Sequence, residues 1–151
     1  VFVGGFPLSL KDLIKEKKIE FHEWNNLVDY PSVVSKLNPT LFYAPLENSK
    51  FNKAKSDLKF IEACAYGIPS VMQDLCTYEN AFHKFNTGDE LISKIETLTG
   101  DYKRYVKECK RAREYMNKRW MEDNIEEYNE LYSFPYADKR RKLLNLRNTI
   151  S

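Results

Sequence analysis

The sequence predicts an α/β fold in which parallel strands form a sheet that helices cover on both faces. Short apolar runs typical of buried strands recur between Val1 and Phe85, and segments with helical spacing of apolar residues separate them. Glycine and proline mark most of the boundaries. Because strands that alternate with helices pair in parallel, this order predicts a parallel sheet with a helical layer on each side.

The first part of the chain supplies three strands and two helices. Val1–Gly4 has the pattern of a buried strand followed by a turn, and Ile19–His22 is the second short strand. A serine cap predicts a helix at Ser9–Lys17, and a proline in the first turn favours another at Tyr30–Leu37. Strand-favouring residues closed by a proline predict the third strand at Thr40–Ala44. Since a native chain rarely begins inside a central strand, we expect this sequence to be part of a longer protein.

The next part supplies two more strands and a helix. Ser70–Met72 is the fourth strand, and Ala81–Phe85 has the pattern of a weak edge strand. A helix is expected at Asp89–Leu98, with its aspartate as the cap and Gly100 at its end.

The C-terminal third is helical and then basic. Apolar residues keep helical spacing over Asp101–Tyr132, with a phase slip near Trp120–Asn124 that predicts a bend or two helices. We expect one domain over residues 1–135 and a basic tail over residues 136–151. The tail has the pattern of a solvated or loosely docked helix, and a membrane-surface or nucleic-acid role is the alternative.

The stretch from Asn52 to Val71 carries the strongest functional pattern. It predicts a basic loop, a helix that Ser56 or Asp57 caps, a stop at Gly67 and a short strand. The apolar residues of the helix fall on one face, which predicts that this face is buried.

Two lysines, Lys53 and Lys55, immediately precede this helix. The unpaired backbone N–H groups of a helix start attract anions, so the combination predicts a phosphate site. The alternative is an ordinary strand–loop–helix unit with lysines on a solvated loop. In parallel sheets, ligands bind beyond the carboxyl ends of the strands. The loops expected there are Gly4–Phe6, Glu23–Leu27, Pro45–Ala54 and Gln73–Glu79.

Composition and residue spacing argue against several functional classes. The net charge of +2 does not favour nucleic acid, and neither a signal peptide nor an apolar run near the length of a membrane span is present. Cys64, Cys76 and Cys109 lack metal-ligand spacing, and His22 and His83 have no second ligand nearby in sequence. We therefore expect no metal, reduced cysteines and a cytoplasmic location, with peripheral membrane binding as an alternative.

The segment Lys55–Pro69 resembles the donor-binding signature of glycosyltransferases of the GT-B fold, in the large group related to glycogen and sucrose-phosphate synthases. That signature is a helix carrying Glu-Ala, then a small residue, then Gly-x-Pro-x-Val. The matching positions are Glu62, Ala63, Gly67, Pro69 and Val71. Val1–Gly5 is similar to a strand of that family that ends in two glycines, and Thr40–Pro45 is similar to its proline-closed strand.

The resemblance implies the C-terminal, Rossmann-like half of a two-domain enzyme. By it, the backbone N–H groups of Ser56, Asp57 and Leu58 would bind the diphosphate of a nucleotide-sugar. Lys53 or Lys55 would neutralise phosphate charge and help the nucleotide to leave.

Two further side chains receive roles from the resemblance. Glu62 would accept hydrogen bonds from both ribose hydroxyls, which suits a carboxylate. The alternative for Glu62 is a surface ion pair with Lys59, one turn earlier. Trp24 would stack on the base, and its alternative is a half-buried loop aromatic.

The sequence departs from the family in two ways. A second glutamate that often lies eight residues before Glu62 is Ala54 here, although some relatives carry Lys-Ser in that region. The first strand of the domain and the whole acceptor-binding domain would precede Val1. We therefore expect this chain alone to be catalytically poor, with an exposed sheet edge that self-association covers.

The expected function is the transfer of a hexosyl group from a UDP-, GDP- or ADP-sugar to a hydroxyl acceptor, without a cofactor. No residue is assigned as catalytic. The alternatives are an inactive nucleotide-binding module and a Rossmann-like interaction domain. Expected partners are the nucleotide-sugar, the missing N-terminal domain and a second copy of the chain.

Overall fold

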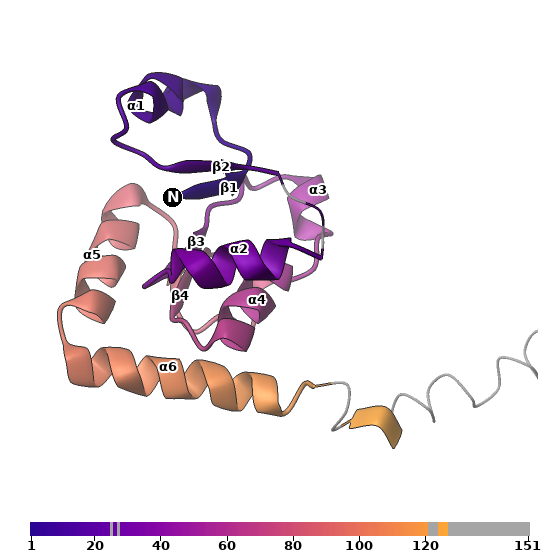
Figure 1. The fold of residues 1–151 in the computed structure, drawn as a ribbon. Helices are drawn as coiled ribbons and strands as arrows, with labels where there is room; N and C mark the ends of the chain where they lie inside the picture. Colours follow the sequence, from indigo (N-terminus) through magenta and orange to yellow (C-terminus); the bar gives the residue numbers. More distant parts are fainter. Residues whose placement is uncertain (25, 27, 121–123, 127–151) are drawn as a thin grey trace, which may run out of the picture. The chain divides into compact units, whose positions relative to one another are not determined.

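The chain forms two compact units, Val1–Pro39 and a second unit that begins at Thr40. The computed structural model describes residues 1–24, 26, 28–120 and 124–126. Every strand pair is parallel, as predicted, and the fold is α/β. In the described ranges the strands form two sheets rather than a single one, with the orders β1-β2 and β3-β4-β5 (Figure 1). Each unit therefore has its own sheet.

The first unit is a βαβ arrangement followed by a helix. Its elements are β1 (Phe2–Gly4), a 3-10 turn η1 (Leu8–Leu10), α1 (Lys11–Lys15), β2 (Phe21–Glu23) and α2 (Tyr30–Leu37). The register of the two strands pairs Phe2 with Phe21, and the rings of Phe6 and Phe21 meet edge to face at 4.7 Å between centroids. The predicted bounds of α2 are confirmed.

Two predictions in the first unit are wrong in their boundaries. The helix expected at Ser9–Lys17 begins as a 3-10 turn, and no side chain caps it. The second strand starts at Phe21 rather than Ile19, because the N–H of Ile19 donates to the carbonyl of Leu13 at 3.2 Å. Ile19 thus closes the end of the helix, where Lys17 adopts a left-handed φ of 56°.

The described part of the second unit has a three-stranded sheet and four α-helices. Its elements are β3 (Phe42–Ala44), α3 (Lys50–Lys53), α4 (Leu58–Tyr66), β4 (Ser70–Gln73), a 3-10 turn η2 (Cys76–Tyr78), β5 (Lys84–Phe85), α5 (Gly88–Thr99) and α6 (Tyr102–Asn117). The long helix α6 packs against both α4 and α5, and Figure 1 shows it running beneath them. No described helix combines the length and the apolar character needed to cross a bilayer.

The core of the second unit lies between α4, β4 and α6. Phe60, Cys64 and Met72 are almost fully buried there, and Ala112 and Met116 of α6 join them. A ring cluster extends this core, because the ring of Phe60 also contacts those of Phe82 and Tyr115.

Local capping decides several helix ends. Gly67 ends α4 with a left-handed φ of 66°, as predicted. The predicted cap at Asp89 is wrong: the hydroxyl of Thr87 accepts from the backbone N–H of Glu90 at 3.2 Å, so α5 begins one residue earlier. Threonine followed three residues later by glutamate is a known capping pattern.

The helical stretch expected at Asp101–Tyr132 is interrupted. Asp101 caps α6 by accepting from the N–H of Lys103 at 2.9 Å, and the helix ends at Asn117. The amide of Asn124 donates to the carbonyls of Lys118 and Trp120, and residues 121–123 and 127–132 of the predicted helical stretch lie outside the described residues. The predicted basic tail, residues 136–151, lies outside the described residues.

Candidate functional site

The segment that leads into α4 contains a short helix, α3, where the sequence predicts a loop. The hydroxyl of Ser49 caps α3 by accepting from the N–H of Asn52 at 3.2 Å. Asn52 is held twice more: its amide donates to the carbonyl of Glu47 at 2.9 Å, and its carbonyl accepts from the hydroxyl of Thr77 at 2.5 Å. The segment is therefore tied to η2 rather than loose.

The first turn of α4 carries the predicted anion-binding groups. The carbonyl of Asp57 accepts from the N–H groups of Phe60 and Ile61, at 2.9 and 3.1 Å. The predicted side-chain cap is wrong for Asp57, which occupies the cap position without a side-chain bond. Within the described residues, the backbone N–H groups of Ser56, Asp57 and Leu58 have no acceptor. Three consecutive donors thus remain for a ligand or for water.

The two predicted lysines lie beside this turn in sequence and are exposed. Lys53 is the last residue of α3, and Lys55 lies two residues further on. The ammonium of Lys55 lies 4.7 Å from the centre of the Phe51 ring, a cation–π contact. No sequence pattern singles out Phe51, which is 74% exposed.

Glu62 lies within α4 and forms the ion pair that was the alternative to its functional role. Its Oε2 lies 2.8 Å from the Nζ of Lys59, and its side chain is 19% exposed. A ligand hydroxyl that reaches Glu62 would therefore meet a carboxylate already paired with an ammonium. The pair is partly screened by solvent on the lysine side, so it contributes little to stability.

Trp24 belongs to the first unit, whereas the other six predicted residues belong to the second. Trp24 directly follows β2 and is 69% exposed. Its ring lies against the backbone of Gly4, since a Cβ added there would be 2.8 Å from Cε3 of the indole. Gly4 has a φ of +89°, so glycine suits both the backbone and the contact. The indole is thus positioned at the carboxyl end of β1.

The charges of Asp57, at the start of α4, and of Arg119, which follows α6, change the pKa of the Tyr115 hydroxyl. Burial raises the pKa of Tyr115, the guanidinium of Arg119 lowers it, and the carboxylate of Asp57 raises it again. The guanidinium of Arg119 lies 4.5 Å from the centre of the Tyr115 ring. Arg119 follows α6, far from α4 in sequence, and no local pattern predicts that its charge acts on the same groups as Asp57.

The remaining titratable candidates have structural partners. His22 contacts Glu20 at 2.6 Å, and His83 contacts Glu108 at 2.9 Å, both between Nε2 and a carboxylate oxygen. No group of three or more histidine, cysteine or acidic side chains in the described part of the chain is arranged to hold a metal ion.

We expect the buried thiol of Cys64 to make stability fall at alkaline pH. Burial raises its pKa from 9.0 to about 11, the charge of Arg119 opposes this, and Asp57 adds to it. Below pH 9 the thiol is protonated in both the folded and the unfolded chain, so its full contribution to stability is present. Between pH 9 and 11 only the unfolded chain loses the proton, and the free energy of unfolding falls, by on the order of 2 kcal/mol.

Denaturant unfolding at a series of pH values, under reducing conditions, measures how the free energy of unfolding changes with pH. Cys64→Ala should flatten the fall between pH 9 and 11, while Cys76→Ala, which changes an exposed cysteine, should keep it. Equal slopes in the parent and in Cys64→Ala would contradict the assignment.

The site geometry in the second unit thus consists of three unpaired amides, two exposed lysines and a paired carboxylate. The exposed indole of Trp24 belongs to the first unit and is described by itself. Comparisons of the chain with protein families, with characterised proteins and with solved structures give no match.

Proposed function

We propose that this chain is the donor-binding part of a GT-B glycosyltransferase that moves a hexosyl group from a nucleoside-diphosphate sugar to a hydroxyl acceptor. The observation that carries the proposal is the row of unpaired N–H groups at Ser56, Asp57 and Leu58, preceded by Lys53 and Lys55. Backbone donors at a helix start, with ammonium groups nearby, match the charge and the hydrogen-bonding capacity of a diphosphate.

Each group has a defined role in this proposal. The amides hold the diphosphate, and Lys55 stabilises the charge that develops on the departing nucleotide. The carboxylate of Glu62 accepts from the ribose hydroxyls, next to the ammonium of its partner Lys59 at 2.8 Å. The indole of Trp24 offers a flat face to the base.

A catalytically silent nucleotide-binding module is the second candidate. Ala54, on the segment between α3 and α4, lies where related enzymes often carry a glutamate. A methyl group cannot accept a hydrogen bond from a sugar hydroxyl, so donor binding without transfer would follow. Turnover by a longer chain that includes an acceptor domain separates the two candidates.

An interaction domain without a small ligand is the third candidate. β3 is the outermost strand of its described sheet, and an edge strand offers backbone groups to another chain. By this candidate, a preceding domain or a second copy pairs with that edge. Calorimetry that shows no heat with UDP, GDP or ADP would favour it.

We expect Lys55→Ala and Glu62→Ala each to weaken nucleotide binding roughly tenfold, because each removes one charge-assisted interaction. The measurement is calorimetry with UDP, GDP and ADP. Lys107→Ala, which removes an exposed lysine from α6, is the matched control and should bind like the parent. Denaturant unfolding should show parent-like stability for all three variants. If Lys55→Ala and Glu62→Ala bind as tightly as the parent, the site is wrong.

A further inference from the structure

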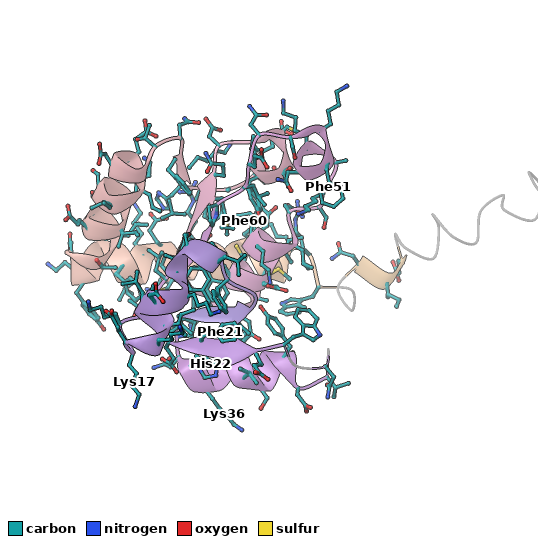
Figure 2. All side chains as sticks on the ribbon, turned by 90° about the horizontal axis from the view of Figure 1, so that it is seen from above. Lys17, Phe21, His22, Lys36, Phe51 and Phe60 are labelled. Atoms are coloured by element: carbon teal, nitrogen blue, oxygen red, sulfur yellow. The ribbon has the colours of Figure 1, made fainter. Side chains whose placement is uncertain are left out.

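Residues 50–59, here called the α3–α4 surface, present apolar and basic side chains together. Its exposed basic and large apolar members are Lys50, Phe51, Lys53, Lys55, Leu58 and Lys59. Phe51 is 74% exposed and Leu58 is 54% exposed, although both are large apolar residues. Figure 2 shows Phe51 at the outside of its helix, whereas Phe60 lies in the interior.

The exposure of Phe51 does not come from a loose loop. Ser49 caps its helix, and the carbonyl of the next residue, Asn52, accepts from the hydroxyl of Thr77 at 2.5 Å. A second contact joins the thiol of Cys76 to the carbonyl of Lys53 at 3.8 Å. The fold therefore holds this ring in water instead of burying it.

The charge of the α3–α4 surface is strongly one-sided. Residues 50–59 hold four lysines and one aspartate, a net charge of +3. Counting Glu62, which pairs with Lys59 from just beyond this range, the net charge is +2, equal to that of the entire chain. The long lysine side chains can keep their ammonium groups at the level of anionic headgroups while an apolar neighbour enters more deeply.

We propose that the α3–α4 surface docks on an anionic lipid bilayer. Phe51 enters the boundary between headgroups and acyl chains, and Lys50 contacts the negatively charged headgroups. Lys53 and Lys55 remain with the proposed nucleotide site. Charge complementarity selects this occupant, because an anionic bilayer satisfies a cluster of lysines and exposed apolar side chains at the same time. Neither Phe51 nor Lys50 belongs to the proposed nucleotide site, so the two proposals can be tested separately.

The test is co-sedimentation of the 151-residue chain with vesicles of phosphatidylcholine, with and without phosphatidylserine. The chain should bind only the vesicles that contain phosphatidylserine, and added salt should weaken the binding. Phe51→Ser should weaken it roughly tenfold, and Lys50→Gln about fivefold. Ile92→Ser, which removes a 56% exposed apolar side chain from α5, should bind like the parent.

Three results would overturn the proposal: no binding by the parent, equal binding to neutral vesicles, or an Ile92→Ser loss as large as that of Phe51→Ser. Parent-like binding by both Phe51→Ser and Lys50→Gln would also reject it. Calorimetry with UDP on Lys50→Gln separates the sites, since Lys50 is not part of the proposed nucleotide site and its variant should keep the parent's nucleotide affinity. If the parent binds vesicles but no nucleotide, the proposed function fails and the docking surface stands.

Discussion

Phe60→Ala should destabilise the chain by about 3–5 kcal/mol, the usual range for removing a fully buried aromatic ring. Phe60 is 0% exposed, and its ring lies 5.2 Å from that of Phe82 and 5.0 Å from that of Tyr115, between centroids. The substitution removes the ring contacts with Phe82, which lies just before β5, and with Tyr115 of α6. It leaves a cavity next to α4. A small domain has only about 5–15 kcal/mol of stability, so part of the population should unfold at room temperature.

Denaturant unfolding followed by circular dichroism measures this effect. Phe51→Ala is the matched control, because it removes the same ring from a position that is 74% exposed, and its effect should stay below about 0.5 kcal/mol. A loss below about 1 kcal/mol for Phe60→Ala would contradict the role of Phe60 as the centre of this core.

Gly67→Ala should destabilise the chain by about 2 kcal/mol, for two reasons that add. The φ of +66° at Gly67 is left-handed, and a residue with a Cβ loses about 1–2 kcal/mol there. The new methyl group would also lie 2.8 Å from Cγ of Arg113, too close for a carbon–carbon contact. Arg113 would have to move away from the end of α4, which loosens the contact between α4 and α6.

Gly88→Ala is the matched control for this prediction. Gly88 begins α5, its φ is not left-handed, and a Cβ there meets no atom within 4 Å. Alanine also favours the helix and restricts the unfolded chain, so this variant should be neutral or slightly more stable. Thermal unfolding of both variants provides the comparison, and equal stability would show that the left-handed end of α4 is not required.

The elements that depend on neighbouring residues were predicted well. Parallel pairing follows from helices between successive strands, and Gly67 ends α4 because glycine adopts a left-handed φ easily. The cap at Asp89 failed because Thr87, two residues earlier, offers a hydroxyl to the N–H of Glu90.

The candidate site was predictable only in part. The sequence placed Lys53, Lys55 and the first turn of α4 together because they are adjacent along the chain. Helical spacing also allowed the pairing of Lys59 with Glu62, three residues apart. The short helix α3 was missed, since its stability includes the hydrogen bond from Thr77 to Asn52, which spans 25 residues.

By itself, the sequence determined the α/β class, the parallel strands, the bounds of α2, the end of α4 at Gly67 and the row of amides beside two lysines. The tertiary structure alone decided that the described strands form two sheets, that Phe51 stays exposed beneath Lys55, and that the charge of Arg119 acts on the same buried groups as Asp57. The physical reason is the distance along the chain over which each kind of interaction acts. Capping, periodicity and turn geometry act within about one helical turn, whereas burial and long-range electrostatics depend on which distant segments the folded chain brings together.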